Sequence, residues 1–551
     1  MRSIESDRPL LDTESQTSDS SERVLEWIDH ASHVERKRLL RRLLAVAHPA
    51  HLLTMTKRIA YCFLPQLLRS HLFDDQAPPD RIFPTSYLNG LRGLTALKVF
   101  TFHYLMVFTP ATHEPWGADA RYTRFIQLPV IRYAWSGFTS HIFFGLAGYL
   151  TCTRLFVLMD KNDQVSQAKI LLSLSASLFR RAFRLYLPVF LITLLMAAYI
   201  HYGLYEANRP LLLDWETLFP GDWNETKPFM YETWAEQLKV WTEEMYQLFN
   251  FPSADTYYPT HDQHLWSMLS EMRASLHLTG CLIALAQCKQ HVRLILMWIL
   301  VGLYLYWDHW EIWIYLLGAI VAQIDQILSH REQGRETEKH ALPTTMTQEK
   351  LDGGFDVPAS HASEARLSSR TIDLLICSGH PGVYQLLRTL GFFVSFYLLS
   401  YPIHGSRDPA PGYEYLNMLI PEWLTRKEKF YANWGTFILL LLLVRSKPGK
   451  SRWRATMSHW LPQYLGRISF ALYLVQAIIQ HSFGYMLPHR IWWSFGVQGI
   501  ELASDWAWFI PIAIGWAITL AVTLWAADCW TREVERRCIR FVKWLEGQCF
   551  R

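Results

Sequence analysis

The chain has 551 residues, half of them apolar, and its 53 Lys and Arg against 49 Asp and Glu leave a net charge of only +4. That charge gives no indication of a nucleic-acid partner. Apolar blocks of roughly 18–25 residues recur along the chain, which is the length that crosses ~30 Å of hydrocarbon, and this excludes a string of soluble domains. The eight cysteines form no CxxC pair and have no histidine at zinc spacing, so we predict no metal site.

The N-terminal part is polar and then amphipathic. Residues 1–22 are rich in Ser, Asp and Glu without the apolar core of a signal peptide, and we expect them to be disordered. Residues 23–86 are predicted to form cytosolic amphipathic helices, because the run ERKRLLRRLLAV alternates basic and leucine positions at helical spacing. Such a helix suits either an anionic membrane leaflet or the cytosolic face of a helical bundle.

Ten apolar segments predict an all-α integral membrane protein with a membrane domain over residues 87–528. The fifth and sixth segments are separated only by Asp-His-Trp, so a single helix is the alternative there. Residues 330–380 are polar and predicted to be a flexible cytosolic loop, and residues 529–551 a basic cytosolic tail. The ten segments lie near residues 88–108, 138–158, 172–203, 265–288, 292–307, 310–328, 383–402, 431–445, 464–484 and 507–528.

The distribution of basic residues predicts that both termini are cytosolic. With that orientation, 36 Lys and Arg lie in cytosolic segments and 11 on the opposite side, as the positive-inside rule requires. Asn224 begins an Asn-Glu-Thr sequon in a loop that this topology places in the lumen, so we expect it to be glycosylated. The endoplasmic reticulum and later secretory membranes fit equally well.

The first segment carries an arginine and a histidine on one helical face. Arg92 and His103 are eleven residues apart, which is about 20° past three full turns and about 16 Å along the axis. Ionisable residues inside a membrane are costly and usually functional. We therefore predict that both side chains face a common site, with Arg92 near the cytosolic entry.

The third segment begins with basic residues at the same membrane level as Arg92. Arg181 and Arg184 share a face at i, i+3. One interpretation is an anion site for the phosphates of CoA, which arginine forks suit well. The other is that these arginines only orient the helix in the membrane.

The fourth segment, HLWSMLSEMRASL, contributes a carboxylate to the far half of the membrane. Ser267 and Glu271 share a face at i, i+4, whereas Arg273 points elsewhere on the helix. Glu271 is predicted to lie in the same layer as His103 and to orient that ring for proton abstraction. A purely structural pair of Glu271 with an arginine or histidine is the alternative.

Two further polar residues are candidates for lining the site. His141 precedes Gly145, Ala147 and Gly148, small residues that permit close helix approach, and its alternative place is the membrane interface. Gln476, in the ninth segment, lies at about the depth of His103.

Together these blocks resemble the membrane acyltransferase-3 family, and in particular its fungal members. The resemblance covers residues 87 to about 528 and depends on the order of YLNGLRGLTALKVFTFHY, HIFFGLAGYL, RRAFRLYLP, LWSMLSEMRASL and GRISFALYLVQ. Two positions depart from the family pattern. Ala147 replaces the serine of the second block, and Gln476 replaces a histidine that often ends the last one.

The resemblance implies transfer of an acyl group, usually acetyl, from acyl-CoA to a hydroxyl group of a small-molecule or carbohydrate acceptor. No bound cofactor is expected, and acyl-CoA is a co-substrate. His103 would be the general base, with Glu271 beside it. The remaining expected roles are CoA binding by Arg92, Arg181 and Arg184, and acceptor lining by Ser267, Arg273, Gln476 and His141.

Other classes remain as alternatives. A transporter of a small organic solute also fits ten spans with buried charges, although no inverted repeat is apparent. A receptor or scaffold, and a membrane acyltransferase of another family with an Asn/His pair, are the others. The tryptophans of the fifth and sixth segments suit an apolar secondary-metabolite alcohol, or equally lipid contact.

Overall fold

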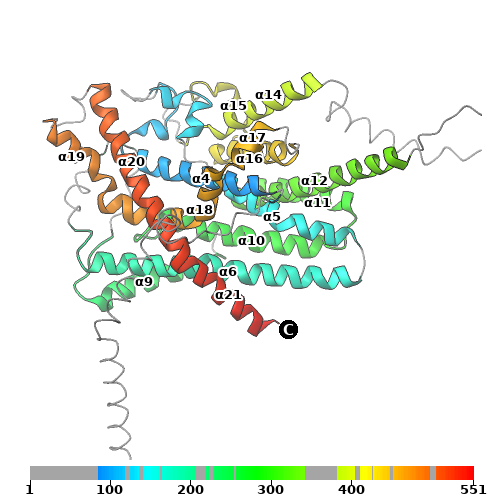
Figure 1. The fold of residues 1–551 in the computed structure, drawn as a ribbon, viewed down its shortest axis with the longest axis horizontal. Coiled ribbons are helices and arrows are strands. Elements are labelled where there is room, and N and C mark those ends of the chain that lie inside the picture. The colour runs from blue at the N-terminus through cyan, green and yellow to red at the C-terminus, as the bar shows by residue number, and fades with distance from the viewer. Residues whose placement is uncertain are drawn as a thin grey trace, which may run out of the picture. The chain divides into compact units, whose positions relative to one another are not determined.

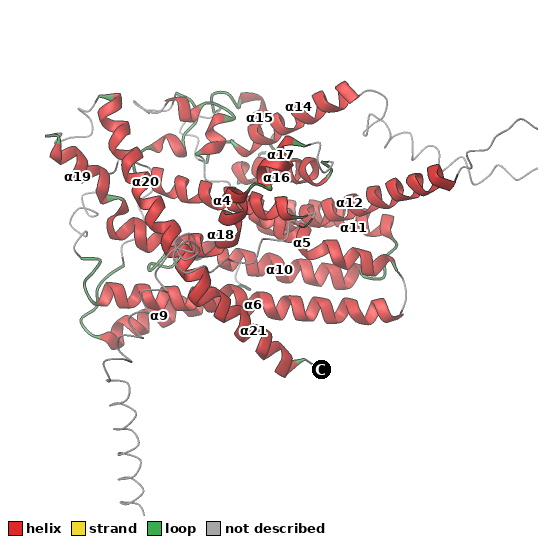
Figure 2. Cartoon of the chain, in the orientation of Figure 1, coloured by secondary structure: helices red, strands yellow, loops and turns green. Residues whose placement is uncertain are grey.

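The apolar segments of the sequence are helices in the computed structural model (Figures 1 and 2). Residues 1–78 and 79–551 are separate units, and the first lies outside the described residues. The predicted disorder of residues 1–22, the amphipathic helices before residue 83 and the sequon at Asn224 are therefore not described. The structure describes Phe83 and residues 85–550 except 118–123, 136–139, 162–163, 207–218, 220, 222–227, 253–255, 342–380, 404–409, 425, 447–450 and 497–503.

Helices make up all the regular elements of the part of the chain that the structure describes. The α-helices are α4 (Ser86–Leu105), α5 (Ser140–Asp160), α6 (Gln164–His201), α9 (Trp234–Phe249), α10 (Trp266–Leu285), α11 (Gln290–Tyr306), α12 (Trp310–Ala341), α14 (Pro381–Leu399), α15 (Glu414–Leu419), α16 (Lys427–Val444), α17 (Arg452–Met457), α18 (Trp460–Ile479), α19 (Met486–Ser494), α20 (Asp505–Trp530) and α21 (Arg536–Cys549). Short 3-10 helices include η4 (Gln263–Leu265), and π-helical turns are η5 (Gln480–Gly484) and η7 (Thr531–Glu535).

Each of the ten predicted segments coincides with a helix, and the all-helical fold class is confirmed for the described residues. The fifth and sixth segments are separate helices, α11 and α12, joined at Asp308, whose φ of 55° makes the turn. The predicted number of ten spans is not confirmed. Within the described residues, five helical stretches are long and apolar enough to cross a membrane, namely Ser140–Asp160, Val165–His201, Trp310–Gln333, Trp460–Ser494 and Trp506–Cys549.

Three helices extend into regions that the sequence predicts as loop or tail. α12 continues to Ala341, so the first part of the predicted flexible loop is helical. α9 lies inside the predicted third loop, where Thr233 and Glu236 form a capping box at its start. α21 forms most of the predicted tail, with Cys538 and Val542 buried and basic residues on its exposed side.

Close helix contacts hold the elements that carry the predicted site. α4 packs on α18, and α5 packs on α12. A Cβ atom on Gly93 of α4 would lie 2.4 Å from the backbone nitrogen of Gly466 on α18, and one on Gly148 of α5 would lie 2.2 Å from the carbonyl oxygen of Tyr315 on α12. These glycines therefore allow the backbones to approach, as small residues do in membrane bundles.

Candidate active site

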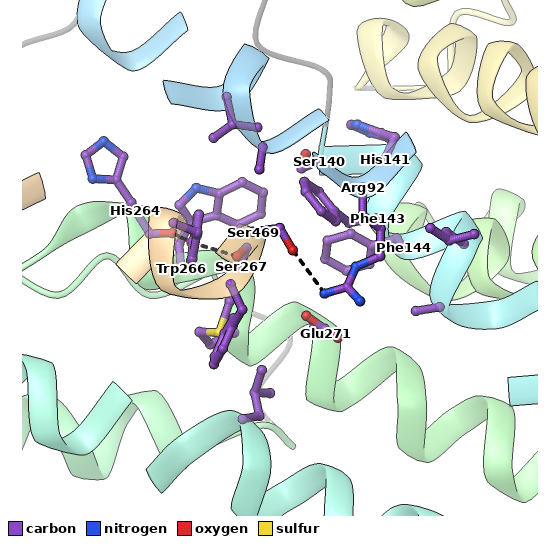
Figure 3. A pocket seen from close by; sticks show the side chains of 18 of the residues that line it. Arg92, Ser140, His141, Phe143, Phe144, His264, Trp266, Ser267, Glu271 and Ser469 are labelled. Carbon is purple, nitrogen blue, oxygen red and sulfur yellow. Dashed lines mark hydrogen bonds between the residues drawn. The ribbon is translucent and has the colours of Figure 1, made fainter. Parts of the chain in front are cut away.

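A cavity of about 620 Å³ lies among α4, α5, α6, α10 and α18 (Figure 3). α16 and the region around η7 and α21 also contribute side chains to its wall. Seven of the residues predicted from the sequence line this one cavity: Arg92, His103, His141, Arg181, Arg184, Ser267 and Glu271. Arg92 and His103, which the sequence places on one face of a helix, both line this cavity from α4.

Arginines gather at one end of the cavity. Nη2 of Arg92 donates a hydrogen bond to Oγ of Ser469 at 3.2 Å, and Nη1 of Arg181 donates to Oγ of Ser275 at 2.8 Å. Arg184 lies in the same wall. Arg180 also lines the cavity and is paired with Glu546. The chain thus supplies four guanidinium groups, each with several N–H donors, to the cavity wall, which is an arrangement suited to an anion.

Two carboxylates accompany these arginines. Glu271 approaches Nη2 of Arg181 at 3.9 Å and lies within electrostatic reach of Arg92. Figure 3 shows its side chain beneath that of Arg92. Glu535, presented by the π-helical turn η7, interacts electrostatically with Arg92 and Arg184. These carboxylates balance part of the positive charge of the arginine group.

The expected contact between Glu271 and His103 is not the one that the structure shows. The neighbours of Glu271 are Arg181, Arg92 and Tyr315. Equal depth in the membrane fixes one coordinate of a side chain but not its direction around the helix axis. Glu271 lies beside Arg181 and Arg92 and belongs to the arginine end of the cavity.

Histidines form the opposite end of the cavity. The ring of His103 lies 3.9 Å from the ring of His264, centroid to centroid, with an interplanar angle of 45°. Gln476 approaches Nδ1 of His103 with its amide nitrogen at 3.0 Å. Gln476 is fully buried and is not among the residues that line the cavity, so it contacts His103 from outside the cavity.

His264 is a site residue that the sequence analysis missed. It belongs to η4, in the loop just before α10, and its Nδ1 lies 3.0 Å from Oδ1 of Asp262. His264 is the first residue of the block HLWSMLSEMRASL, but it precedes the predicted span 265–288 by one residue and was assigned no role. The signal that would have found it is the Asp-Gln-His run ahead of Leu265.

The other predicted lining residues have defined places. Ser267 shares a hydrogen bond of 2.8 Å with the hydroxyl of Tyr473 at the cavity wall. His141 lines the cavity and packs on the ring of Trp310 at 4.6 Å. Arg273 is not in the wall. It is buried in an ion pair of 2.9 Å with Glu311, because it lies two residues from Glu271 and so on another side of α10.

The loop that carries His264 is anchored on α9. Oε1 of Glu244 accepts a hydrogen bond from the backbone nitrogen of Thr260 at 3.0 Å, and Oε2 approaches Nδ1 of His261 at 2.6 Å. Burial raises the pKa of Glu244, but the hydrogen bonds from His261 and Thr260 outweigh it, and the pKa is lowered from its usual value.

Among the described residues, no group of three His, Cys, Asp or Glu side chains could hold a metal ion.

Comparisons with known proteins identify the family of the chain. The model of a family described as "Acyltransferase domain" matches residues 85–526. The O-acetyltransferase PaAT-1 of Phomopsis amygdali is 24% identical over 530 residues, which is 88% of this chain and 93% of the relative. The acyltransferase clz18 of Cochliobolus lunatus is 23% identical, over 83% of this chain and 93% of its own length. The acyltransferase R4 of a Phoma species is 22% identical, over 84% and 95% respectively. No solved structure matches.

Proposed function

This chain belongs to the membrane acyltransferase-3 family and is an acyltransferase, and from that premise we propose that it moves an acyl group from acyl-CoA to a hydroxyl group of a small-molecule or carbohydrate acceptor. The observation that carries the proposal is the single cavity that joins an arginine group to a histidine pair. A transporter or scaffold needs no such pairing.

Arg92, Arg181 and Arg184 bind the phosphates of the donor in this proposal. Guanidinium groups bind phosphate with paired, charge-assisted hydrogen bonds. Ser469 and Ser275 already orient two of them. The thioester end of the donor extends from the arginines toward His103, about 16 Å away along α4.

His103 acts as the general base. It takes the proton of the acceptor hydroxyl while the hydroxyl oxygen attacks the thioester carbonyl carbon. The new C–O ester bond forms, the C–S bond breaks, and the CoA thiolate leaves and recovers the proton from His103. Positioned base catalysis of this kind contributes roughly 10²–10⁴ in rate. Ser267 and His141, in the same wall, are placed to contact the acceptor.

Acetyl is the proposed acyl group, since the relative PaAT-1 carries the name O-acetyltransferase. The acceptor is proposed to be a secondary-metabolite-like alcohol or a sugar, reached within the bilayer or from the lumen. The protein is integral to the membrane, and we propose an endoplasmic-reticulum or later secretory membrane with both termini cytosolic.

The test uses membranes that contain the chain, matched membranes without it, labelled acetyl-CoA or a longer acyl-CoA, and a pool of candidate alcohols. We expect label in an ester product, and one CoA thiol released for each ester formed. Acceptor-independent accumulation of an unchanged solute inside sealed vesicles, with no thiol released from any donor, would contradict the proposal.

A further inference from the structure

The base described above is in contact with a second histidine that the reaction as written does not use. His264 packs its ring on that of His103 at 3.9 Å and is almost fully buried. A buried imidazole ring in contact with a proton-abstracting imidazole affects how well the latter holds a proton. The contacts around His264 indicate what that effect is.

Asp262 fixes the orientation of His264. Its Oδ1 atom accepts from the backbone nitrogen of His264 at 3.0 Å and lies 3.0 Å from Nδ1 of the same ring. A carboxylate accepts only, so Nδ1 of His264 carries a hydrogen. A neutral His264 ring therefore has its lone pair on Nε2.

The loop that holds this pair is fastened from two sides. Glu244 on α9 accepts hydrogen bonds from the backbone and side chain of both Thr260 and His261. On the other side, the hydroxyl of Tyr473 donates to the carbonyl oxygen of His264. An active-site group held by several such bonds keeps its geometry during the reaction.

One helix supports both histidines. Tyr473 and Gln476 are three residues apart on α18, so they lie on one face. Tyr473 contacts the backbone of His264, and Gln476 contacts Nδ1 of His103. α18 therefore contacts both histidines, His103 on α4 and His264 in η4, and helps to hold the two rings together.

On the basis of the proposed function, we propose that Asp262 and His264 are a positioning pair for the base His103. When His103 takes the acceptor's proton, the imidazolium forms against a neutral ring whose far side is bonded to a carboxylate. The ring face and the carboxylate both stabilise the positive charge. No proton passes to His264, and no bond forms to it. Its contribution is to hold His103 in place and to stabilise the charge that develops there.

The experiment measures thiol release from acetyl-CoA with the acceptor found for the wild type, in membranes carrying His264→Phe or Asp262→Asn. Phe keeps an aromatic ring against His103 but cannot bond Asp262, and Asn keeps an acceptor oxygen but no charge. We expect kcat to fall about ten- to a hundredfold in each variant, which is the scale of a hydrogen bond to a charged group. The KM for acetyl-CoA should be unchanged, because the arginine group is untouched.

His489→Phe is the matched control, since His489 is an equally buried histidine that is not among the cavity-lining residues, and its kcat should stay at the wild-type value. Wild-type kcat in His264→Phe would overturn the inference. If that variant is not produced in normal amount, Asp262→Asn decides, and wild-type kcat there overturns the inference equally. A wild type that releases no thiol would instead overturn the proposed function, which the same assay shows before any variant is compared.

Discussion

At the scale of single residues, Gln476 has a role that its sequence context did not reveal. It stands where the family often has a histidine, and the sequence suggested a glutamine that lines the acceptor pocket. In the structure it is buried behind His103 and bonded to Nδ1 of that ring. An amide can hold either tautomer of an imidazole by presenting its oxygen or its nitrogen.

Replacing this amide tests the support that it gives. Gln476→Leu keeps a similar volume and removes the hydrogen bond to His103. We expect kcat to fall about tenfold, the effect of a net hydrogen bond of ~1.4 kcal/mol, with the KM for acceptor little changed. If Gln476→Leu instead raises the KM for the acceptor and leaves kcat unchanged, Gln476 contacts the acceptor, as the sequence suggested. Steady-state kinetics in membranes separate the two results.

The arginines that line the cavity are expected to determine how tightly the donor binds. Arg184→Gln removes one guanidinium from the cavity, and we expect KM for acyl-CoA to rise about tenfold or more, since a charge-assisted hydrogen bond contributes ~1.5–3 kcal/mol. Arg537→Gln is the control, because Arg537 is an exposed arginine of α21 paired with Glu533. Equal KM values in the two variants would show that the phosphates bind elsewhere.

Removing the carboxylate of Glu535 should change the KM for acyl-CoA in the opposite direction. Glu535 lies in the cavity wall beside Arg92 and Arg184. In the proposed function it would compete with a donor phosphate for the same guanidinium groups. Glu535→Gln removes that charge, so KM for acyl-CoA should fall. Glu533→Gln, which alters the partner of Arg537 on the same turn, should leave KM unchanged. A rise of KM in Glu535→Gln would indicate that Glu535 orders the arginines instead.

At the scale of elements, helix pairing depends on glycines at the helix contacts, and hydropathy does not show which glycines these are. Gly93→Ala would place a Cβ atom 2.4 Å from the backbone of Gly466, whereas a Cβ atom on Gly302 of α11 meets nothing within 4 Å. We expect Gly93→Ala to destabilise the protein by about 1–3 kcal/mol, the cost of overpacking. Gly302→Ala should be neutral. Thermal unfolding in detergent compares the two, and equal melting temperatures would show that α4 and α18 separate easily.

The loop between α9 and α10 should respond to acid. The pKa of Glu244 is lowered by its hydrogen bonds to His261 and Thr260 despite burial, so its anchoring is complete above the usual carboxylate pKa and is lost as the pH falls through the lower pKa of the folded protein. Hydrogen exchange in residues 256–265 should therefore rise at acidic pH. In Glu244→Gln the same residues should exchange faster at neutral pH too, and a pH-independent wild type would contradict this account.

Sequence periodicity predicted the helices better than it predicted the contacts between them. Helical spacing placed Arg92 and His103 on one face, because that relation lies within a single helix. The partner of Glu271 depends on how α10 is turned against α4 and α6, which depth in the membrane does not determine. His264 and α9 were missed because polar segments between apolar ones carry no burial signal, although here His264 lines the cavity and α9 anchors its loop.

At the scale of the whole molecule, apolar segment lengths predicted an all-helical membrane protein, and the ordered motifs predicted its family. The cavity could not be predicted, because it forms from five helices whose pairing no single segment encodes. Helices such as α4 and α10 are not among the five apolar stretches long enough to span a membrane, because polar residues that face the cavity reduce their hydropathy.

The orientation in the membrane is a prediction of the charge distribution, with 36 Lys and Arg against 11 on the two sides. It places Asn224 in the lumen. Glycosidase treatment should therefore lower the apparent mass of the wild type and leave Asn224→Gln unchanged. A wild type that is insensitive to glycosidase, together with protease protection of the C-terminal tail in sealed vesicles, would reverse the orientation.

The most direct measurement is the rate of acyl transfer in membranes that contain the wild type, His103→Gln or His489→Gln in equal amount. Gln cannot serve as a base at neutral pH, so the account predicts a loss of roughly 10²–10⁴ in kcat for His103→Gln. His489→Gln, at a buried histidine that is not in the cavity wall, should transfer at the wild-type rate. Undiminished acyl transfer by His103→Gln would contradict the account at its centre.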